Sequence, residues 1–161
     1  MKKSKDAMVY LGGAIDLAAG VDARGAIIKA LTGEVGGMFN PKTAFAGITN
    51  MNSVSAEIVK INKHALTNCD IAVFVLDQKV PSIGTPMEIL IAKEANIPTF
   101  VIYITDDVNF VPAYISGIVR KWMVVERNKP NGEIHKGIFN MLDDYDSIKE
   151  QDIQEYYFKQ F

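Results

Sequence analysis

Residues 70–95, DIAVFVLDQKVPSIGTPMEILIAKEA, decide the fold of this chain. The run from Ile71 to Leu76 is continuously apolar, which predicts a strand covered on both faces of a parallel sheet. Asp77 ends that strand, and a short Ser/Gly loop leads to a helix that opens with Thr85-Pro86-Met87-Glu88. Open α/β sheets bind ligands where strand ends meet helix N-termini. We therefore expect the Glu88 carboxylate to lie within reach of a ligand.

A second interpretation of Glu88 is purely structural. Thr85-x-x-Glu88, with Pro86 at the first helical position, has the spacing of a capping box. In that motif the Thr hydroxyl and the Glu carboxylate each accept a hydrogen bond from a backbone N–H at the helix start. Spacing alone favours the capping box, because such motifs commonly do no more than start helices.

Strand and helix patterns alternate along the chain. Strands are expected at residues 8–12, 35–39, 71–76, 97–104 and 122–126. Helices are expected at residues 22–32, 53–67, 85 onward, 111–121 and 131–142. This alternation indicates βαβ units. It predicts one α/β domain over residues 1–161, with a doubly wound, flavodoxin-like, mostly parallel five-stranded sheet and helices on both faces.

Composition excludes several classes of protein. Apolar residues make up 48% of the chain, and the formal net charge of −2 gives no electrostatic footprint for nucleic acid. No apolar run is long enough to span a bilayer, so no membrane partner is expected. The single cysteine, Cys69, excludes an intramolecular disulfide framework and fits a cytoplasmic location. The two histidines, His64 and His135, show no metal-ligand spacing.

Two further features mark candidate ligand-facing positions. Gly12-Gly13 ends the first predicted strand and lets the backbone approach a ligand closely, although a tight turn explains the pair equally well. Asn62 falls on the stripe of the helix 53–67 that is expected to face inward, with Ile58, Ile61, Ala65 and Leu66. A buried amide without partners costs about 1–3 kcal/mol. Asn62 is therefore expected to bond either the neighbouring backbone or a ligand.

Three segments occur together in a distinctive order and spacing: residues 9–15 (VYLGGAI), 68–73 (NCDIAV) and 81–89 (PSIGTPMEI). Over about residues 8–104 the chain resembles the nucleoside 2-deoxyribosyltransferase family, which also contains deoxynucleoside 5′-monophosphate N-glycosidases. The resemblance implies a doubly wound α/β fold, in agreement with the alternation of strands and helices. It also implies an enzyme of nucleotide salvage that acts on small-molecule deoxynucleosides or deoxynucleotides and nucleobases.

The resemblance assigns roles residue by residue. Glu88 matches the family's nucleophile, and Tyr10 matches the tyrosine whose hydroxyl holds that carboxylate. Gly84 and Thr85 match the loop beside the sugar. The implied reaction is attack of Glu88 on C1′, which gives a glycosyl-enzyme intermediate. It requires no metal and no redox cofactor.

Two positions depart from the transferase pattern. Ser82 stands where transferases usually carry an Asp that binds the sugar 5′-hydroxyl, and the monophosphate glycosidases carry Ser there. A hydroxyl tolerates a phosphate that a carboxylate would repel, and Lys79 or Arg24 could add positive charge. Asn62 stands where many members have an Asp near the base. Because an amide cannot deliver a proton, Asp16 is a candidate substitute.

Three functions remain open at this point. Transfer of the sugar to another nucleobase gives a transferase, and transfer to water gives a hydrolase. A non-catalytic nucleotide-binding module is the alternative from another class. A homo-oligomer is also expected, because family members assemble as dimers or higher multiples. The aromatic residues of the late segments also exceed what five strands and their helices obviously bury: Phe110, Tyr114, Trp122, Tyr156, Tyr157 and Phe158.

Overall fold

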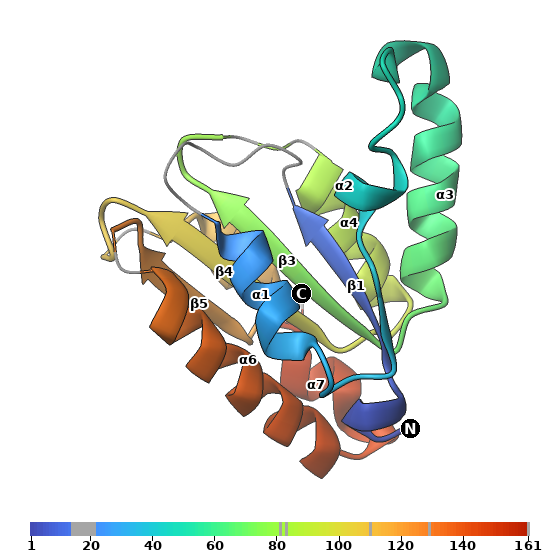
Figure 1. The fold of residues 1–161 in the computed structure, drawn as a ribbon. Coiled ribbons are helices and arrows are strands. Elements are labelled where there is room, and N and C mark those ends of the chain that lie inside the picture. The colour runs from blue at the N-terminus through green and yellow to red at the C-terminus, as the bar shows by residue number, and fades with distance from the viewer. Residues whose placement is uncertain (14–21, 81, 83, 110, 129, 161) are drawn as a thin grey trace.

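The structure is a computed structural model, and it describes residues 1–13, 22–80, 82, 84–109, 111–128 and 130–160. Its strands form one five-stranded sheet in the order β2-β1-β3-β4-β5 (Figure 1). They are β1 (Met8–Gly13), β2 (Gly37–Phe39), β3 (Ile71–Asp77), β4 (Thr99–Thr105) and β5 (Trp122–Glu126). Every neighbouring pair is parallel. This is the flavodoxin-like strand order, so the predicted fold class is confirmed.

Helices cover both faces of the sheet. They are α1 (Ala23–Leu31), α2 (Pro41–Ala44), α3 (Ser55–Thr67), α4 (Gly84–Glu94), α5 (Ala113–Ile118), α6 (Pro130–Ser147) and α7 (Ile153–Tyr157). Short 3₁₀ turns lie at Ser4–Asp6, Met51–Val54 and Glu150–Asp152. Helices α1 and α6 pack on one face, and α3, α4 and α5 contribute buried side chains to the other (Figure 1).

Several predicted boundaries shift. Helix α6 continues five residues past the predicted end at 142, because Tyr145 is buried against the rest of the core. Helix α5 is shorter than the predicted 111–121. The sequence patterns did not reveal α2, which starts with Pro41 and is capped by Asn40, whose side chain accepts a hydrogen bond from the Lys42 N–H. A helix of four residues is too short to show hydrophobic periodicity.

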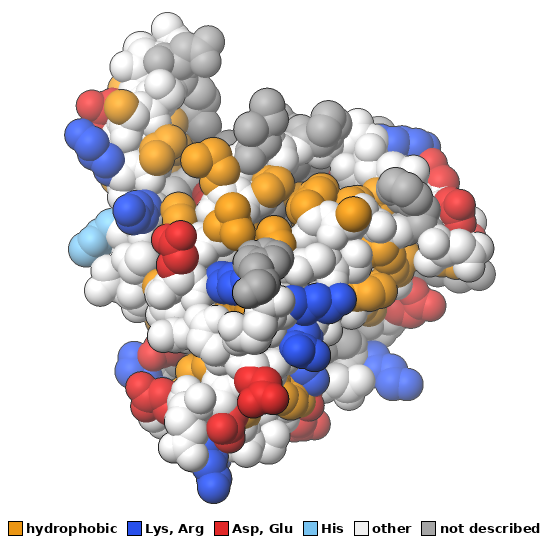
Figure 2. All heavy atoms as spheres, turned by 180° about the vertical axis from the view of Figure 1, so that it is seen from behind, with side chains coloured by type: hydrophobic (Ala, Val, Ile, Leu, Met, Phe, Trp, Pro, Cys, Tyr) orange, Lys and Arg blue, Asp and Glu red, His pale blue; other side chains and the backbone are white. Residues whose placement is uncertain are grey.

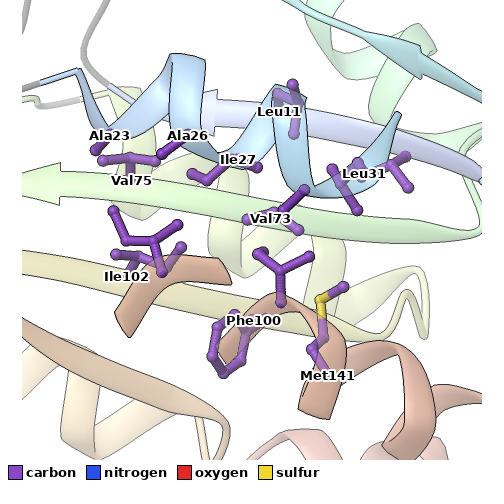
Figure 3. Close-up of a cluster of buried hydrophobic side chains, with 14 of the residues drawn as sticks. Leu11, Ala23, Ala26, Ile27, Leu31, Val73, Val75, Phe100, Ile102 and Met141 are labelled. Carbon is purple, nitrogen blue, oxygen red and sulfur yellow. The ribbon is translucent and has the colours of Figure 1, made fainter. Parts of the chain in front are cut away.

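A hydrophobic cluster lies on each face of the sheet, and β1 contributes side chains to both. Val9 and Leu11 belong to the cluster under α1 and α6, whereas Tyr10 belongs to the cluster under α3 and α4. Figure 3 shows the first cluster, in which Leu11 and Val73 from neighbouring strands lie against α1. Because successive side chains of a strand point to opposite faces, Tyr10 is directed toward α4.

The inward stripe of α3 differs from the prediction. Ile61 is 47% exposed, and only Leu66 of the four predicted residues is fully buried. Asn62 is half-buried instead. The cause is the position of the helix, since α3 packs beside α4 and its N-terminal half extends past the strand ends (Figure 1). Apolar side chains remain on the surface of this face of the molecule (Figure 2).

Two of the aromatic residues from which an oligomer was predicted are buried within the single chain, so they do not support that prediction. Tyr157 and Phe158 are buried within the single chain, where they pack against Ile153. Tyr114 and Trp122, in contrast, are 40% and 37% exposed. Phe110 lies outside the described residues. None of the helices in the described part of the chain is long and apolar enough to cross a membrane.

Candidate active site

The candidate site lies at the carboxyl edge of the sheet, where β1 and β3 are neighbours. The chain leaves β1 toward α1 on one face and leaves β3 toward α4 on the other. In doubly wound sheets this reversal opens the crevice that binds ligands. Helix α4 packs against both strands, and Glu88 near its N-terminus faces β1.

Side chains from two other elements converge on the Glu88 carboxylate. The Tyr10 hydroxyl, from β1, donates a hydrogen bond of 2.9 Å to Oε1. The Asn62 amide, from α3, donates one of 3.3 Å to the same oxygen. No hydrogen bond from a described residue reaches Oε2. One carboxylate oxygen is thus held in place by donors from two other elements.

These contacts exclude the capping-box interpretation of Glu88. The helix begins at Gly84, one residue before the predicted start, so Thr85 lies within its first turn. The Thr85 N–H donates to the Ser82 hydroxyl at 3.3 Å, and the two hydroxyl oxygens are 2.8 Å apart. Ser82 therefore closes the first turn, and the Glu88 carboxylate is directed toward the edge of the sheet.

The glycine pair at the end of β1 is required by close packing. A Cβ atom on Gly12 would lie 2.2 Å from Phe74 Cδ1 and 3.1 Å from Glu88 Oε2. Gly13 has a φ of +124°, and its Cβ would lie 2.2 Å from the Val75 carbonyl oxygen. No side chain fits at either position, so the backbone of β1 comes directly against the carboxylate.

The electrostatics of the site favour a reactive carboxylate. Burial raises the pKa of Glu88, and the hydrogen bonds from Tyr10 and Asn62 together with the charge of Arg24 oppose that rise. Burial, followed by the charge of Glu88, also raises the pKa of Tyr10, so its hydroxyl keeps its proton and remains a donor. A partly desolvated carboxylate with a shifted pKa is typical of a functional site.

Arg24 is a site residue whose burial the sequence interpretation missed. It is 6% exposed, and its Nη1 donates to the Leu11 carbonyl oxygen at 2.9 Å and to Asn40 Oδ1 at 3.1 Å. Arg24, Ile27 and Leu31 have the i, i+3, i+7 spacing of one helix face. That spacing was the available signal that Arg24 belongs to the buried side of α1.

The remaining predicted site residues that the structure describes form no hydrogen bond or ion pair with the Glu88 carboxylate. Gly84 is exposed at the start of α4, whereas Thr85 is 2% exposed. Lys79, a candidate phosphate partner, instead forms an ion pair of 2.8 Å with Asp106. Asp16 lies outside the described residues.

Comparison of the sequence with protein-family models gives no match, and comparison with curated proteins gives none either. Within the described residues, no group of three or more His, Cys, Asp or Glu side chains is arranged to hold a metal ion. The features that bear on function are therefore the geometry around Glu88 and the sequence resemblance.

Proposed function

We propose that this protein is a nucleoside 2-deoxyribosyltransferase-like enzyme, which cleaves the N-glycosidic bond of a 2′-deoxynucleoside and transfers the sugar to another nucleobase. The observation that carries the proposal is the carboxylate of Glu88, held by Tyr10 and Asn62 at the carboxyl edge of β1. The partners proposed for the site are small molecules, and the proposed location is the cytoplasm, which suits the buried thiol of Cys69.

The proposed reaction has two displacements at C1′. Glu88 Oε2 attacks C1′ while the C1′–N bond breaks and its electron pair leaves with the base. Positive charge develops on the sugar in this transition state, and the adjacent carboxylate stabilises it. A nitrogen of the second base then attacks C1′ and displaces Glu88, which regenerates the free carboxylate, while the proton of that nitrogen returns to the group that protonated the first base.

Tyr10 and Asn62 divide the supporting roles. The Tyr10 hydroxyl fixes Oε1 and leaves Oε2, which lies beside Gly12, as the proposed attacking oxygen. Asn62 Nδ2 reinforces this orientation, and its buried Oδ1 has no hydrogen-bond partner among the described residues. A buried acceptor of this kind suits an N–H or O–H group of the substrate. Asp16 is the residue proposed to deliver a proton to the leaving base, because the Asn62 amide cannot supply one.

A deoxynucleoside 5′-monophosphate N-glycosidase is the second candidate, and Ser82 favours it. Its hydroxyl lies beside the first turn of α4, where backbone N–H groups and the helix dipole favour an anion. In the transferases to which the chain is similar, the corresponding carboxylate would repel a phosphate. In this variant of the reaction, water replaces the second base.

A non-catalytic binding module is the weakest of the three candidates. Such a module gains nothing from a carboxylate whose burial raises its pKa and makes its ionised form costly. A neutral Gln at position 88 would accept the hydrogen bonds from Tyr10 and Asn62 without that cost.

The deciding experiment is incubation of the protein with 2′-deoxynucleosides or their 5′-monophosphates, with and without an acceptor base. Base exchange that requires the acceptor supports the transferase. Free base without acceptor supports the hydrolase. Intact-mass measurement after acid quenching should detect a deoxyribosyl adduct on the wild type and none on Glu88→Ala. Full activity in a folded Glu88→Ala protein would exclude Glu88 as the nucleophile, and the absence of any turnover by the wild type would leave the binding module.

A further inference from the structure

A buried ion pair lies at the carboxyl edge of the sheet, apart from the side chains that contact Glu88. Asp77, the last residue of β3, has a fully buried side chain, and the side chain of Arg127, which follows β5, is 13% exposed. Arg127 Nη1 donates to Asp77 Oδ2 at 2.9 Å, and Nη2 donates to Oδ1 at 2.5 Å. A planar guanidinium that bonds both oxygens fixes the orientation of the carboxylate as well as its distance.

The carboxylate of Asp77 shapes the start of the loop that leads to α4. Its Oδ1 also accepts the Lys79 N–H at 2.8 Å, and the Asp77 carbonyl oxygen accepts the Val80 N–H at 3.1 Å. Aspartate side chains that bond the backbone two residues ahead commonly form turns. The turn after β3 is therefore set by a side chain whose own orientation is fixed by Arg127.

A second carboxylate extends this connection to the loop after β4. Asp106 Oδ1 accepts from Arg127 Nε at 2.9 Å, and Asp106 Oδ2 lies 2.8 Å from Lys79 Nζ. Gln78 adds uncharged bonds, since its N–H donates to the Ile104 carbonyl oxygen at 2.9 Å and its Oε1 accepts the Asp106 N–H at 3.1 Å. The start of the β3–α4 loop is thus bound to the ends of β4 and β5.

The other end of the same loop carries residues of the candidate site. Ser82 follows Asp77 in this loop, and its hydroxyl accepts the Thr85 N–H in the first turn of α4. Glu88 comes about one turn later, where side chains from β1 and α3 hold its carboxylate. A displacement of the loop should therefore affect Ser82 and Thr85 more than it affects Glu88.

We propose that Arg127 is a positioning residue that acts through Asp77 and the β3–α4 loop, and that it sets the place of Ser82 at the 5′ end of the substrate. The effect on substrate binding rests on the proposed function, whereas the positioning of the loop does not. Stability alone gives little reason for the pair, because a buried ion pair is often no more stabilising than apolar side chains of the same volume. The contact with both carboxylate oxygens adds a fixed direction for the loop.

The test compares hydrogen exchange at the two ends of α4 in the full chain, measured by NMR. The double variant Asp77→Asn/Arg127→Gln removes both charges and keeps polar side chains at both positions. Exchange of the Thr85 N–H should become about 10-fold faster in this variant, because the loop that closes the first turn is no longer held. Exchange of the Ala95 N–H, which bonds the Ile91 carbonyl oxygen at 3.0 Å, should not change.

Two single variants sharpen the comparison. Lys79→Gln removes only the exposed contact with Asp106 and is the matched control, so Thr85 exchange should stay near that of the wild type. Arg127→Lys keeps the charge but loses the fork that bonds both oxygens, so Thr85 exchange should rise, but less than in the double variant. Arg127→Lys decides the question if the double variant does not fold.

Unchanged Thr85 exchange in the folded double variant, or in Arg127→Lys if the double variant is unfolded, would overturn the proposal. Equal acceleration at Thr85 and Ala95 would also overturn it, since a general loss of stability explains that result.

If base release is observed, KM should rise about 10-fold in the double variant while kcat changes little, because the loop contributes to binding and other elements orient Glu88. An unchanged KM would overturn the part of the proposal that concerns the substrate. If Thr85 exchange responds but no substrate releases a base, the proposed function fails and the positioning of the loop stands.

Discussion

Tyr10 and Glu88 lie 78 positions apart in the sequence, and a hydrogen bond of 2.9 Å joins their side chains. The bond forms because β1 and β3 are neighbours in the sheet and α4 returns from β3 across the face that Tyr10 occupies. Glu88 therefore forms a hydrogen bond with a distant strand and does not cap the first turn of its own helix.

Tyr10→Phe should lower kcat at least about 10-fold and change KM little, because the hydroxyl orients the carboxylate most effectively in the transition state. The ring should stay in place, since it stacks on Phe39 with a centroid separation of 5.8 Å. Loss of the bond should also move the acid limb of the rate profile to higher pH, because this bond lowers the pKa of Glu88. Steady-state kinetics across pH provide the measurement. A weaker KM with an unchanged kcat would reassign Tyr10 to the wall of the pocket.

Glu88→Gln should stabilise the fold more at high pH than at low pH. Because the folded-state pKa of Glu88 is raised above its ordinary value of 4.5, the folded protein binds the proton more tightly than the unfolded chain. Its contribution to stability is present at low pH and is lost as the pH rises through the folded-state value. The difference in Tm between Glu88→Gln and wild type should therefore grow between pH 4 and pH 8. Glu94→Gln, exposed on the same helix, is the control. A pH-independent difference would contradict the prediction.

Gly12→Ala should lower both stability and activity. The added methyl would lie 2.2 Å from the Phe74 ring, and such overpacking costs about 1–3 kcal/mol. It would also press on Glu88 Oε2, so activity should fall even where the protein remains folded. Urea unfolding measures the first effect and base release the second. Gly84→Ala is the matched control for stability, because its Cβ meets nothing within 4 Å among the described residues. Equal loss of stability in both variants would refute the steric argument.

Ser82→Asp should shift the preference from the 5′-monophosphate toward the free nucleoside. One hydrogen bond to the phosphate is exchanged for repulsion, which corresponds to about 1–3 kcal/mol in relative kcat/KM. Competition between the two substrates in one reaction measures the ratio directly. Ser82→Ala separates the loss of the hydroxyl from the added charge. Identical ratios in the wild type and Ser82→Asp would mean that Ser82 only shapes the helix start, where it accepts from the Thr85 N–H.

The protein is expected to be a homo-oligomer, and the face of α3, α4 and α5 is the expected interface. Exposed apolar side chains gather on this face (Figure 2), among them Val59, Ile61, Met87, Leu90 and Tyr114. Light scattering after size exclusion measures the mass. Leu90→Lys should shift the mass toward the monomer, whereas Phe139→Lys, on α6 of the opposite face, should not. A monomer mass for the wild type at every concentration would contradict the prediction.

The local pattern of apolar residues along the sequence was sufficient to predict most of the fold. The apolar run of β3 and the alternation of strands and helices are properties of neighbouring residues, so the sheet and its strands were predictable from the chain alone. Where the pattern is short or one-sided the prediction failed. Helix α2 has only four residues, and Ile61 is exposed because α3 extends past the sheet.

The candidate site, too, was indicated only in part by the sequence. The resemblance pointed to Glu88 and Tyr10, but the sequence left two interpretations of Glu88 open, because a capping box and a ligand-facing carboxylate share one spacing. Only the packing of α4 against β1 and α3 shows what the carboxylate contacts, by bringing Tyr10 and Asn62 to the same carboxylate oxygen. The burial of Arg24 was decided in the same manner, by contacts to Leu11 and Asn40. Sequence determines which residues form each element, whereas hydrogen bonds and charges between distant elements exist only after the sheet has set those elements side by side.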